Sequence, residues 1–208
     1  LRPELIVAPL EFHRANVLAK LEELKIPVLL LEATSLEQVF AHIHTLGRIF
    51  DRSTAAHALT AEMRQQMADI SRRTEGLSRT RVLYVINSQP LITVGPGSYI
   101  HQMIGLAGGI NIASGAATAY PRLTMETVLK EDPQILIFPR GSVETVPRSE
   151  QEAWRRWTTL TAVQENRLRE VSADALNRPG PRVMQGLEAL ARVIHPEAFA
   201  SESTAAQP

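Results

Sequence analysis

The chain contains 208 residues, and its 22 basic and 22 acidic side chains give a formal net charge of zero. A balanced charge produces no broad positive field, which argues against nucleic acid and against an anionic membrane surface as partners. The absence of cysteine excludes disulfides, thiol catalysis and metal sites with cysteine ligands. A chain of this length can bury a substantial core, either in one domain or in two smaller ones.

Short, continuous apolar runs alternate with helical patterns along the chain, and this alternation is typical of an α/β fold with mostly parallel sheets. Apolar runs that do not alternate with polar residues indicate strands that are covered on both faces. We therefore predict buried parallel strands at four places, residues 4–8 (ELIVA), 28–31 (VLLL), 81–86 (RVLYVI) and 135–138 (ILIF).

A long helical pattern separates the first two of these runs from the last two. Residues 54–79 contain no glycine or proline before Gly76, and apolar residues recur there at spacings of three, four and seven. One helix of about 22 residues would be roughly 33 Å long, which is long for a crossover within one domain. The pattern therefore predicts a helix that joins two lobes.

The predicted helix divides the chain into four parts. These are a partial N-terminal lobe over residues 1–53, the inter-lobe helix over 54–79, a C-terminal lobe over 80–197 and a small, polar, disordered tail over 198–208. The first part offers only two strands and two helices, which is too little for a sheet covered on both faces. We therefore expect the first lobe to be incomplete, with further strands ahead of Leu1.

The succession of segments carries a family resemblance over residues 1–197. The segments that carry it include LRPELIVAPLEF, RVLYVINSQPLITVGPGSYIHQMIGLAGGINIA, YPRLTMETVLKEDPQILIFP and RPGPRVMQGLEALARVIHPE. In this order they resemble the periplasmic binding proteins of ABC importers for cobalamin (vitamin B12), haem and ferric siderophores. They look most similar to the cobalamin-binding branch of that family.

The resemblance implies two lobes of mostly parallel sheet flanked by helices, joined by one long helix, with the ligand in the cleft between them. The expected ligand is cobalamin or a related corrinoid, with haem or a ferric siderophore as the alternative, and no separate cofactor is expected. The implied partners are the permease of an ABC importer and its ATPase. The implied location is periplasmic or extracytoplasmic, with membrane contact only through the importer or a lipid anchor.

The resemblance also implies which residues border the ligand. Tyr120 stands beside Pro121 in a loop, and an aromatic side chain suits the apolar area of a flat macrocycle. Leu91 and Leu176 are also explained as core residues. The full set of expected ligand contacts in the second lobe is Pro90, Leu91, Thr93, Gly97, Ser98, Tyr99, Tyr120, Leu176, Asn177 and Arg178.

The loop GPGS, residues 95–98, precedes a predicted helix and admits three interpretations. Free amides there could bind an anion, but the loop lacks the lysine of a phosphate-binding loop and the spacing of a dinucleotide fingerprint. A tight turn with Ser98 capping the helix also explains it. The resemblance favours a wall of the cleft, where glycines let the backbone approach a bulky ligand.

The histidines give no predicted metal site. His42 and His44 are two apart on a predicted helix, about 200° around its axis, so they do not share one metal. His13 follows the carboxyl end of the first strand, where ligands bind in α/β proteins. It is therefore either a ligand contact or an exposed residue at a helix start.

No catalytic motif supports an enzyme. The chain lacks a G-x-S-x-G elbow, an H-E-x-x-H pair and a phosphate loop with lysine. Metal-cluster proteins that share this kind of cleft need cysteine ligands, which this chain does not have. We therefore predict a binding protein rather than an α/β enzyme that uses the same cleft for chemistry.

Glu126 lies in the first turn of a predicted helix that Thr124 can cap. A carboxylate at this position complements the helix dipole by about 0.3–1 kcal/mol and needs no partner. The resemblance adds a second interpretation, because it implies a glutamate on the outer surface of the second lobe that pairs with arginines of the permease. We expect Glu126 to be this docking residue.

Overall fold

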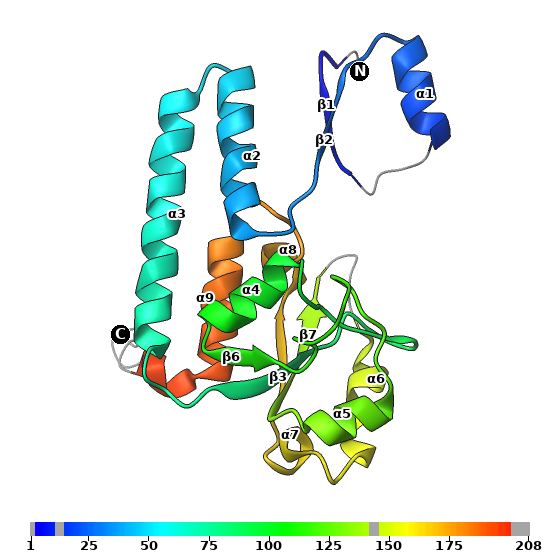
Figure 1. The fold of residues 1–208 in the computed structure, drawn as a ribbon, viewed down its shortest axis with the longest axis vertical. Coiled ribbons are helices and arrows are strands. Elements are labelled where there is room, and N and C mark those ends of the chain that lie inside the picture. The colour runs from blue at the N-terminus through cyan, green and yellow to red at the C-terminus, as the bar shows by residue number, and fades with distance from the viewer. Residues whose placement is uncertain (1–2, 11–14, 142–145, 201–208) are drawn as a thin grey trace.

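The computed structural model describes residues 3–10, 15–141 and 146–200. Its N-terminal part is a β–α–β unit, which we call the N-terminal unit, made of β1 (Ile6–Pro9), α1 (Ala15–Glu23) and β2 (Val28–Leu31). The two strands pair in parallel, with Ile6 opposite Val28 and Pro9 opposite Leu31. Figure 1 shows this unit in blue at the upper right, beside the helices that follow it.

The strands of the N-terminal unit are less buried than predicted. All four residues of β2 are only partly buried, and Val7 of β1 keeps 45% of its surface exposed. A sheet of two strands offers too little area for helices to cover both of its faces. The prediction of buried strands is therefore wrong for this pair.

Two neighbouring helices follow, α2 (Leu36–Ile49) and α3 (Ser53–Thr74). The hydroxyl of Ser35 caps α2, because it accepts a hydrogen bond from the backbone N–H of Gln38. α3 is one continuous helix of 22 residues. It ends at Thr74 rather than at residue 79, because Glu75 is extended and Gly76 has a φ of +80°.

The C-terminal part, which we call the sheet unit, is built on a four-stranded parallel sheet with the order β6–β3–β7–β8. Its strands are β3 (Thr80–Tyr84), β6 (Gly109–Asn111), β7 (Ile135–Arg140) and β8 (Leu168–Ser172). A short antiparallel hairpin of β4 (Asn87–Ser88) and β5 (Leu91–Ile92) follows β3. The helices of this unit are α4 (Tyr99–Leu106), α5 (Met125–Glu131), α6 (Arg148–Ala153), η1 (Trp154–Arg156), α7 (Thr161–Gln164), α8 (Ala173–Leu176), α9 (Val183–Ile194) and η2 (Pro196–Phe199).

Alternate residues of the central strands enter two separate cores, as the pleat of a strand requires. Val82 and Tyr84 of β3 join a core that contains residues of α2, α3, α4 and α9. Leu83, which lies between them, joins a second core that contains Trp154. The sheet therefore lies between two helical layers, and the predicted burial of the apolar runs is confirmed for β3 and β7.

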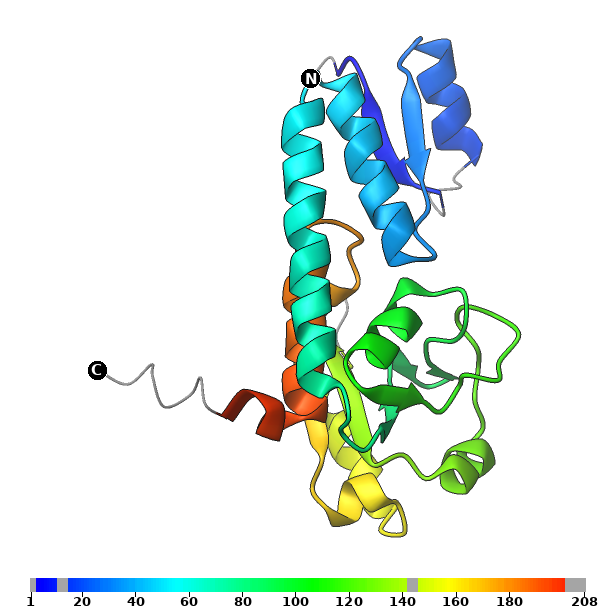
Figure 2. The same cartoon turned by 60° about the vertical axis from the view of Figure 1, so that its left-hand side comes forward.

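α3 runs from its turn with α2 to the start of the sheet unit. It contacts α2, α4 and α9, and Figure 2 shows it extending from the top of the α2–α3 pair toward the level of the four-stranded sheet. The sequence thus folds as an α/β protein of parallel sheets flanked by helices. Among the described residues, no helix is both long and apolar enough to cross a membrane.

The end of the chain differs from the expectation of a disordered tail that begins at residue 198. The short helix η2 follows α9, and its Phe199 is buried. The guanidinium groups of Arg73 and Arg192 lie 5.2 and 4.7 Å from the centre of its ring, where cation–π attraction holds them. Residues 201–208 lie outside the described residues.

Candidate ligand-binding cleft

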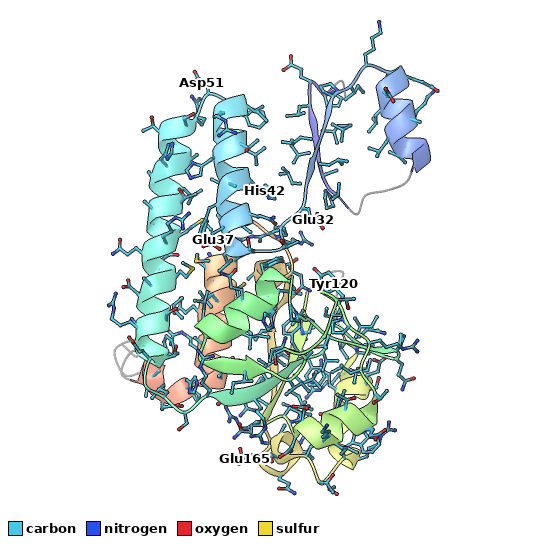
Figure 3. All side chains as sticks on the ribbon, in the orientation of Figure 1. Glu32, Glu37, His42, Asp51, Tyr120 and Glu165 are labelled. Atoms are coloured by element: carbon cyan, nitrogen blue, oxygen red, sulfur yellow. The ribbon has the colours of Figure 1, made fainter. Side chains whose placement is uncertain are left out.

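A cavity of about 420 Å³ lies where the N-terminal unit faces the sheet unit, and we call it the cleft. Its upper side includes Pro9 and Leu31, at the carboxyl ends of β1 and β2, and Glu32 in the link that follows. α2 supplies His42. The lower side is formed by Tyr99, Tyr120, Asn177, Arg178 and Pro179. Figure 3 shows Glu32 and His42 above this space and Tyr120 below it.

Hydrogen bonds within the sheet unit fix the lower side of the cleft. The hydroxyl of Tyr99 donates to the carbonyl oxygen of Leu176 at 2.7 Å, which ties α4 to α8. The hydroxyl of Tyr84 donates to Oδ1 of Asn177 at 2.8 Å, which ties the end of α8 to the central strand β3. Because both tyrosines are buried, these bonds hold the lower wall in one geometry.

The two charged side chains that line the cleft among the described residues come from opposite sides. Arg178 lies on the lower side, and its Nη2 pairs with Oδ1 of Asp174 at 3.0 Å. Glu32 lies on the upper side, in the exposed link after β2. Tyr120 is half exposed and presents an aromatic ring to solvent on the lower side. The described part of the cleft therefore combines aromatic and aliphatic surface with polar groups, which suits a bulky ligand that has both apolar and polar edges.

His42 was not predicted at the cleft. Partial burial holds its pKa below the ordinary value of 6.5, so the imidazole is neutral near pH 7. A neutral imidazole nitrogen can bind the metal of a chelate. The described residues contain no group of three or more histidine and acidic side chains placed to hold a metal ion by themselves.

Four of the predicted contacts line the cleft, and six described ones do not. Tyr99, Tyr120, Asn177 and Arg178 line it. Pro90 and Leu91 line a different cavity, beside Trp154. His13 lies outside the described residues.

The remaining predicted contacts serve the fold of the sheet unit. Thr93 is fully buried, and its hydroxyl donates to the carbonyl of Tyr84. Leu176 is also fully buried. Gly97 adopts a φ of +86° in the turn before α4, and the hydroxyl of Ser98 caps that helix by accepting from the N–H of Ile100. The turn-and-cap interpretation of the GPGS loop therefore describes its local geometry.

Glu126 lies in the first turn of α5 and is exposed. The hydroxyl of Thr124 accepts a hydrogen bond from the N–H of Thr127, so the predicted cap is confirmed. Among the described residues, Glu126 makes no ion pair. Its carboxylate is therefore available at the surface, next to Met125, which lines the cavity that contains Pro90 and Leu91.

The model of the periplasmic binding protein family matches residues 1–175 of the chain. The chain belongs to this family. Members are non-enzymatic transport components, so the expectation of a substrate-binding protein of an ABC importer is confirmed at the level of the family.

Similar proteins include a vitamin B12-binding protein of Vibrio cholerae, 26% identical over 90% of this chain and 67% of its own length. The crystal structure of a periplasmic vitamin B12-binding protein of Vibrio cholerae matches 95% of this chain and 75% of that chain, with a TM-score of 0.75 and 26% identity. A structure of an ABC-type Fe3+-hydroxamate transport system from Saccharomonospora viridis matches 95% of this chain and 69% of that chain, with a TM-score of 0.73 and 27% identity.

Proposed function

We propose that this chain binds cobalamin or a related corrinoid in the cleft and delivers it to the permease and ATPase of an ABC importer. The observation that carries the proposal is the cleft itself, in which Tyr99 and Tyr120 face the ends of β1 and β2. The vitamin B12-binding proteins at 26% identity support this choice of ligand. The protein would act on the extracytoplasmic side of the membrane, either free or through a lipid anchor.

The chemistry of the cleft agrees with a large macrocycle. Burial of apolar ligand surface contributes about 25 cal/mol per Å², so the exposed ring of Tyr120 and the aliphatic residues opposite would supply most of the affinity. Arg178 is already paired with Asp174, and Asn177 is already bonded to Tyr84. These residues would thus orient polar edges of the ligand rather than neutralise a strong charge.

The same proposal treats the N-terminal unit and the sheet unit as two lobes that α3 joins. A ligand that touches both sides of the cleft favours the arrangement in which the two sides are closest, because only that arrangement makes all of the contacts. The long, packed helix would limit the range of this closure. The proposal therefore expects a modest rather than a large domain movement.

Haem is the second candidate, and His42 is the observation that favours it. Haem iron is commonly held by a histidine or a tyrosine, and a neutral imidazole is the form that coordinates. His42 has this form near pH 7 because burial lowers its pKa. It lines the same cavity as Tyr99 and Tyr120. A ferric siderophore remains the third candidate, supported by the Fe3+-hydroxamate relative.

Titration of the full chain with cyanocobalamin, with haemin and with a ferric hydroxamate tests the proposal. Calorimetry should give binding of cyanocobalamin, and Tyr120→Ala should weaken it by about tenfold because an aromatic contact is lost. Ile110→Ala is the matched control, because Ile110 is an exposed apolar residue on the edge strand β6 and does not line the cleft. It should bind like the wild type.

The same titrations decide between the ligands. Preferential binding of haemin, with a Soret shift that His42→Ala removes, would replace cobalamin by haem. Binding of all three ligands that is unchanged by Tyr120→Ala would show that the cleft is not the ligand site. No binding of any of the three would overturn the proposal for this chain.

Glu126 supplies the proposed contact with the importer. It is exposed at the start of α5, and it makes no ion pair within the described part of the chain. An acidic side chain at the rim of an interface chiefly sets the docking orientation and the association rate. We therefore propose that Glu126 pairs with an arginine of the permease.

A further inference from the structure

A second cavity, of about 540 Å³, lies in the sheet unit between the β4–β5 hairpin, the start of α5 and the α6–η1 helices. We call it the tryptophan cavity. It shares no lining residue with the cleft. Its volume is within the range of sites that bind small molecules, which is roughly 300–1,000 Å³. The proposed binding of a corrinoid in the cleft does not use the tryptophan cavity.

The walls of the tryptophan cavity are apolar and held in place. Trp154 is only 5% exposed, and its ring meets the buried ring of Phe138 edge-on at 6.5 Å between centres. Leu91 is 7% exposed, and Trp157 and Met125 are among the other apolar residues of the lining. Because Trp154 belongs to the packed core beneath the sheet, this wall is preformed.

Two exposed arginines of the lining carry positive charge that no described carboxylate pairs with. Arg122 and Arg156 line the cavity, and neither makes an ion pair within the described residues. The guanidinium of Arg156 lies 5.3 Å from the centre of the Trp157 ring. The neighbouring Arg155 differs, because its Nε pairs with Glu152 at 2.7 Å. Among the described residues, Glu150 is the one carboxylate of the lining, so positive charge is in excess there.

A polar atom inside the lining also lacks a partner. The hydroxyl oxygen of Ser88 is buried and makes no hydrogen bond to any of the described residues. Ser88 lies on β4 and lines the tryptophan cavity. A buried hydroxyl without a partner costs free energy, but this oxygen has almost no accessible surface and so does not face the open volume of the cavity.

We propose that the tryptophan cavity is a second binding site, specific for small organic anions that join an apolar body to one carboxylate. The apolar body lies against Trp154, Trp157 and Leu91, and the carboxylate meets the guanidinium groups of Arg122 and Arg156. Charge-assisted hydrogen bonds from guanidinium to carboxylate are the strong ones, and the aromatic walls exclude water from the chain of the ligand. The site is independent of the ligand of the cleft.

Decanoate is a suitable probe, with decanol as its neutral match. The chain has only two tryptophans, and both line this cavity, so their fluorescence reports on its occupancy. We expect saturable decanoate binding, seen both in the fluorescence and by calorimetry. The Arg122→Gln/Arg156→Gln variant should weaken decanoate binding at least tenfold, and decanol binding less than twofold. Arg155→Gln is the matched control and should leave both affinities unchanged.

Two further variants make the result decisive. Leu91→Ala should weaken decanoate and decanol together, because it removes apolar wall. Tyr120→Ala, which alters the cleft, should leave decanoate binding unchanged. The proposal is overturned if decanoate fails to change the fluorescence up to its solubility limit. It is also overturned if Arg155→Gln weakens binding as much as the double variant, or if Tyr120→Ala abolishes it.

Discussion

Asp132 links the end of α5 to the start of α7 through a carboxylate that is only partly exposed. Its Oδ1 accepts the backbone N–H of Thr161 at 2.8 Å, and its Oδ2 accepts the Thr161 hydroxyl at 2.6 Å and Nη2 of Arg81 at 3.3 Å. Partial burial raises the pKa of this carboxyl, but the bonds from Thr161 and the charge of Arg81 outweigh it, so the pKa lies below its ordinary value of 3.8. The folded protein therefore favours the ionised form.

Asp132→Asn should remove stability that depends on pH. With the folded pKa below the unfolded one, the carboxylate contributes fully above about pH 4 and loses its contribution as the pH falls through the folded pKa. The variant should lose on the order of 1 kcal/mol at pH 7, because solvent screens a side chain that is 36% exposed. Urea unfolding at pH 7 and pH 3 measures this. The difference from the wild type should shrink at pH 3.

Asp69→Asn is the matched control for this measurement. Asp69 forms an exposed pair with Arg72 at 2.6 Å, one turn away on the same helix, and such pairs contribute about 0–1 kcal/mol. A difference at pH 7 that persists unchanged at pH 3 would contradict the assignment for Asp132, because it would not depend on the charge of the carboxylate.

A hydrogen bond between α4 and the start of α2 fixes the position of α2 beside the cleft. Oε1 of Gln102, on α4, accepts the backbone N–H of Leu36 at 3.0 Å, where α2 begins and its first N–H groups lack helical partners. Nε2 of the same side chain donates to Glu37 at 3.4 Å. α2 directly follows the N-terminal unit and carries His42. This bond therefore fixes the position of the His42 side of the cleft relative to α4, which carries Tyr99.

Gln102→Ala should therefore loosen the start of α2. The lost hydrogen bond should cost about 1 kcal/mol of unfolding free energy, and the amide of Leu36 should exchange its hydrogen faster than in the wild type. Urea unfolding and amide exchange by NMR measure the two effects. Gln66→Ala is the control, because within the described residues the side chain of Gln66 bonds to Glu62 on the same face of α3 and to no residue of α2. Equal exchange of Leu36 in both variants would rule out a role for this junction.

The elements that sequence reasoning predicts well are those with strong local signals. The strand at residues 28–31 is β2 within the same bounds, Thr124 caps α5 as predicted, and Ser98 caps α4 as one of the three interpretations of its loop required. β8 was not predicted, because its segment LREVS alternates charge with apolar residues and becomes a strand only by pairing with β7. Local propensity does not contain that pairing.

In the candidate site too, local signals were predictable from the sequence and contacts between distant segments were not. Tyr120 was predicted at the cleft because a loop aromatic has few other uses, whereas His42 was missed because its role depends on how α2 faces the N-terminal unit. Pro90 and Leu91 were assigned to the cleft through the family resemblance, and the hairpin that carries them faces the tryptophan cavity instead. Spacing along a helix or a hairpin gives the face of a residue but not the neighbour opposite that face.

The exposed carboxylate of Glu126, at the start of α5, is the proposed contact of the whole protein with the importer, and Glu126→Ala tests it. The variant should bind cyanocobalamin like the wild type, because Glu126 does not line the cleft. It should bind the protein's own importer, reconstituted in nanodiscs, roughly two- to fivefold more weakly at low salt, which is the range of an exposed ion pair. Salt screens exposed charges within about 10 Å at 0.1 M, so the difference should diminish as the salt concentration rises.

Glu165→Ala is the matched control, because Glu165 is exposed and lies at the opposite end of the sheet unit from the cleft in Figure 3. Loss of cyanocobalamin affinity, or importer binding equal to that of the control at low salt, would remove Glu126 from the docking surface and leave it as a charge that stabilises the start of α5.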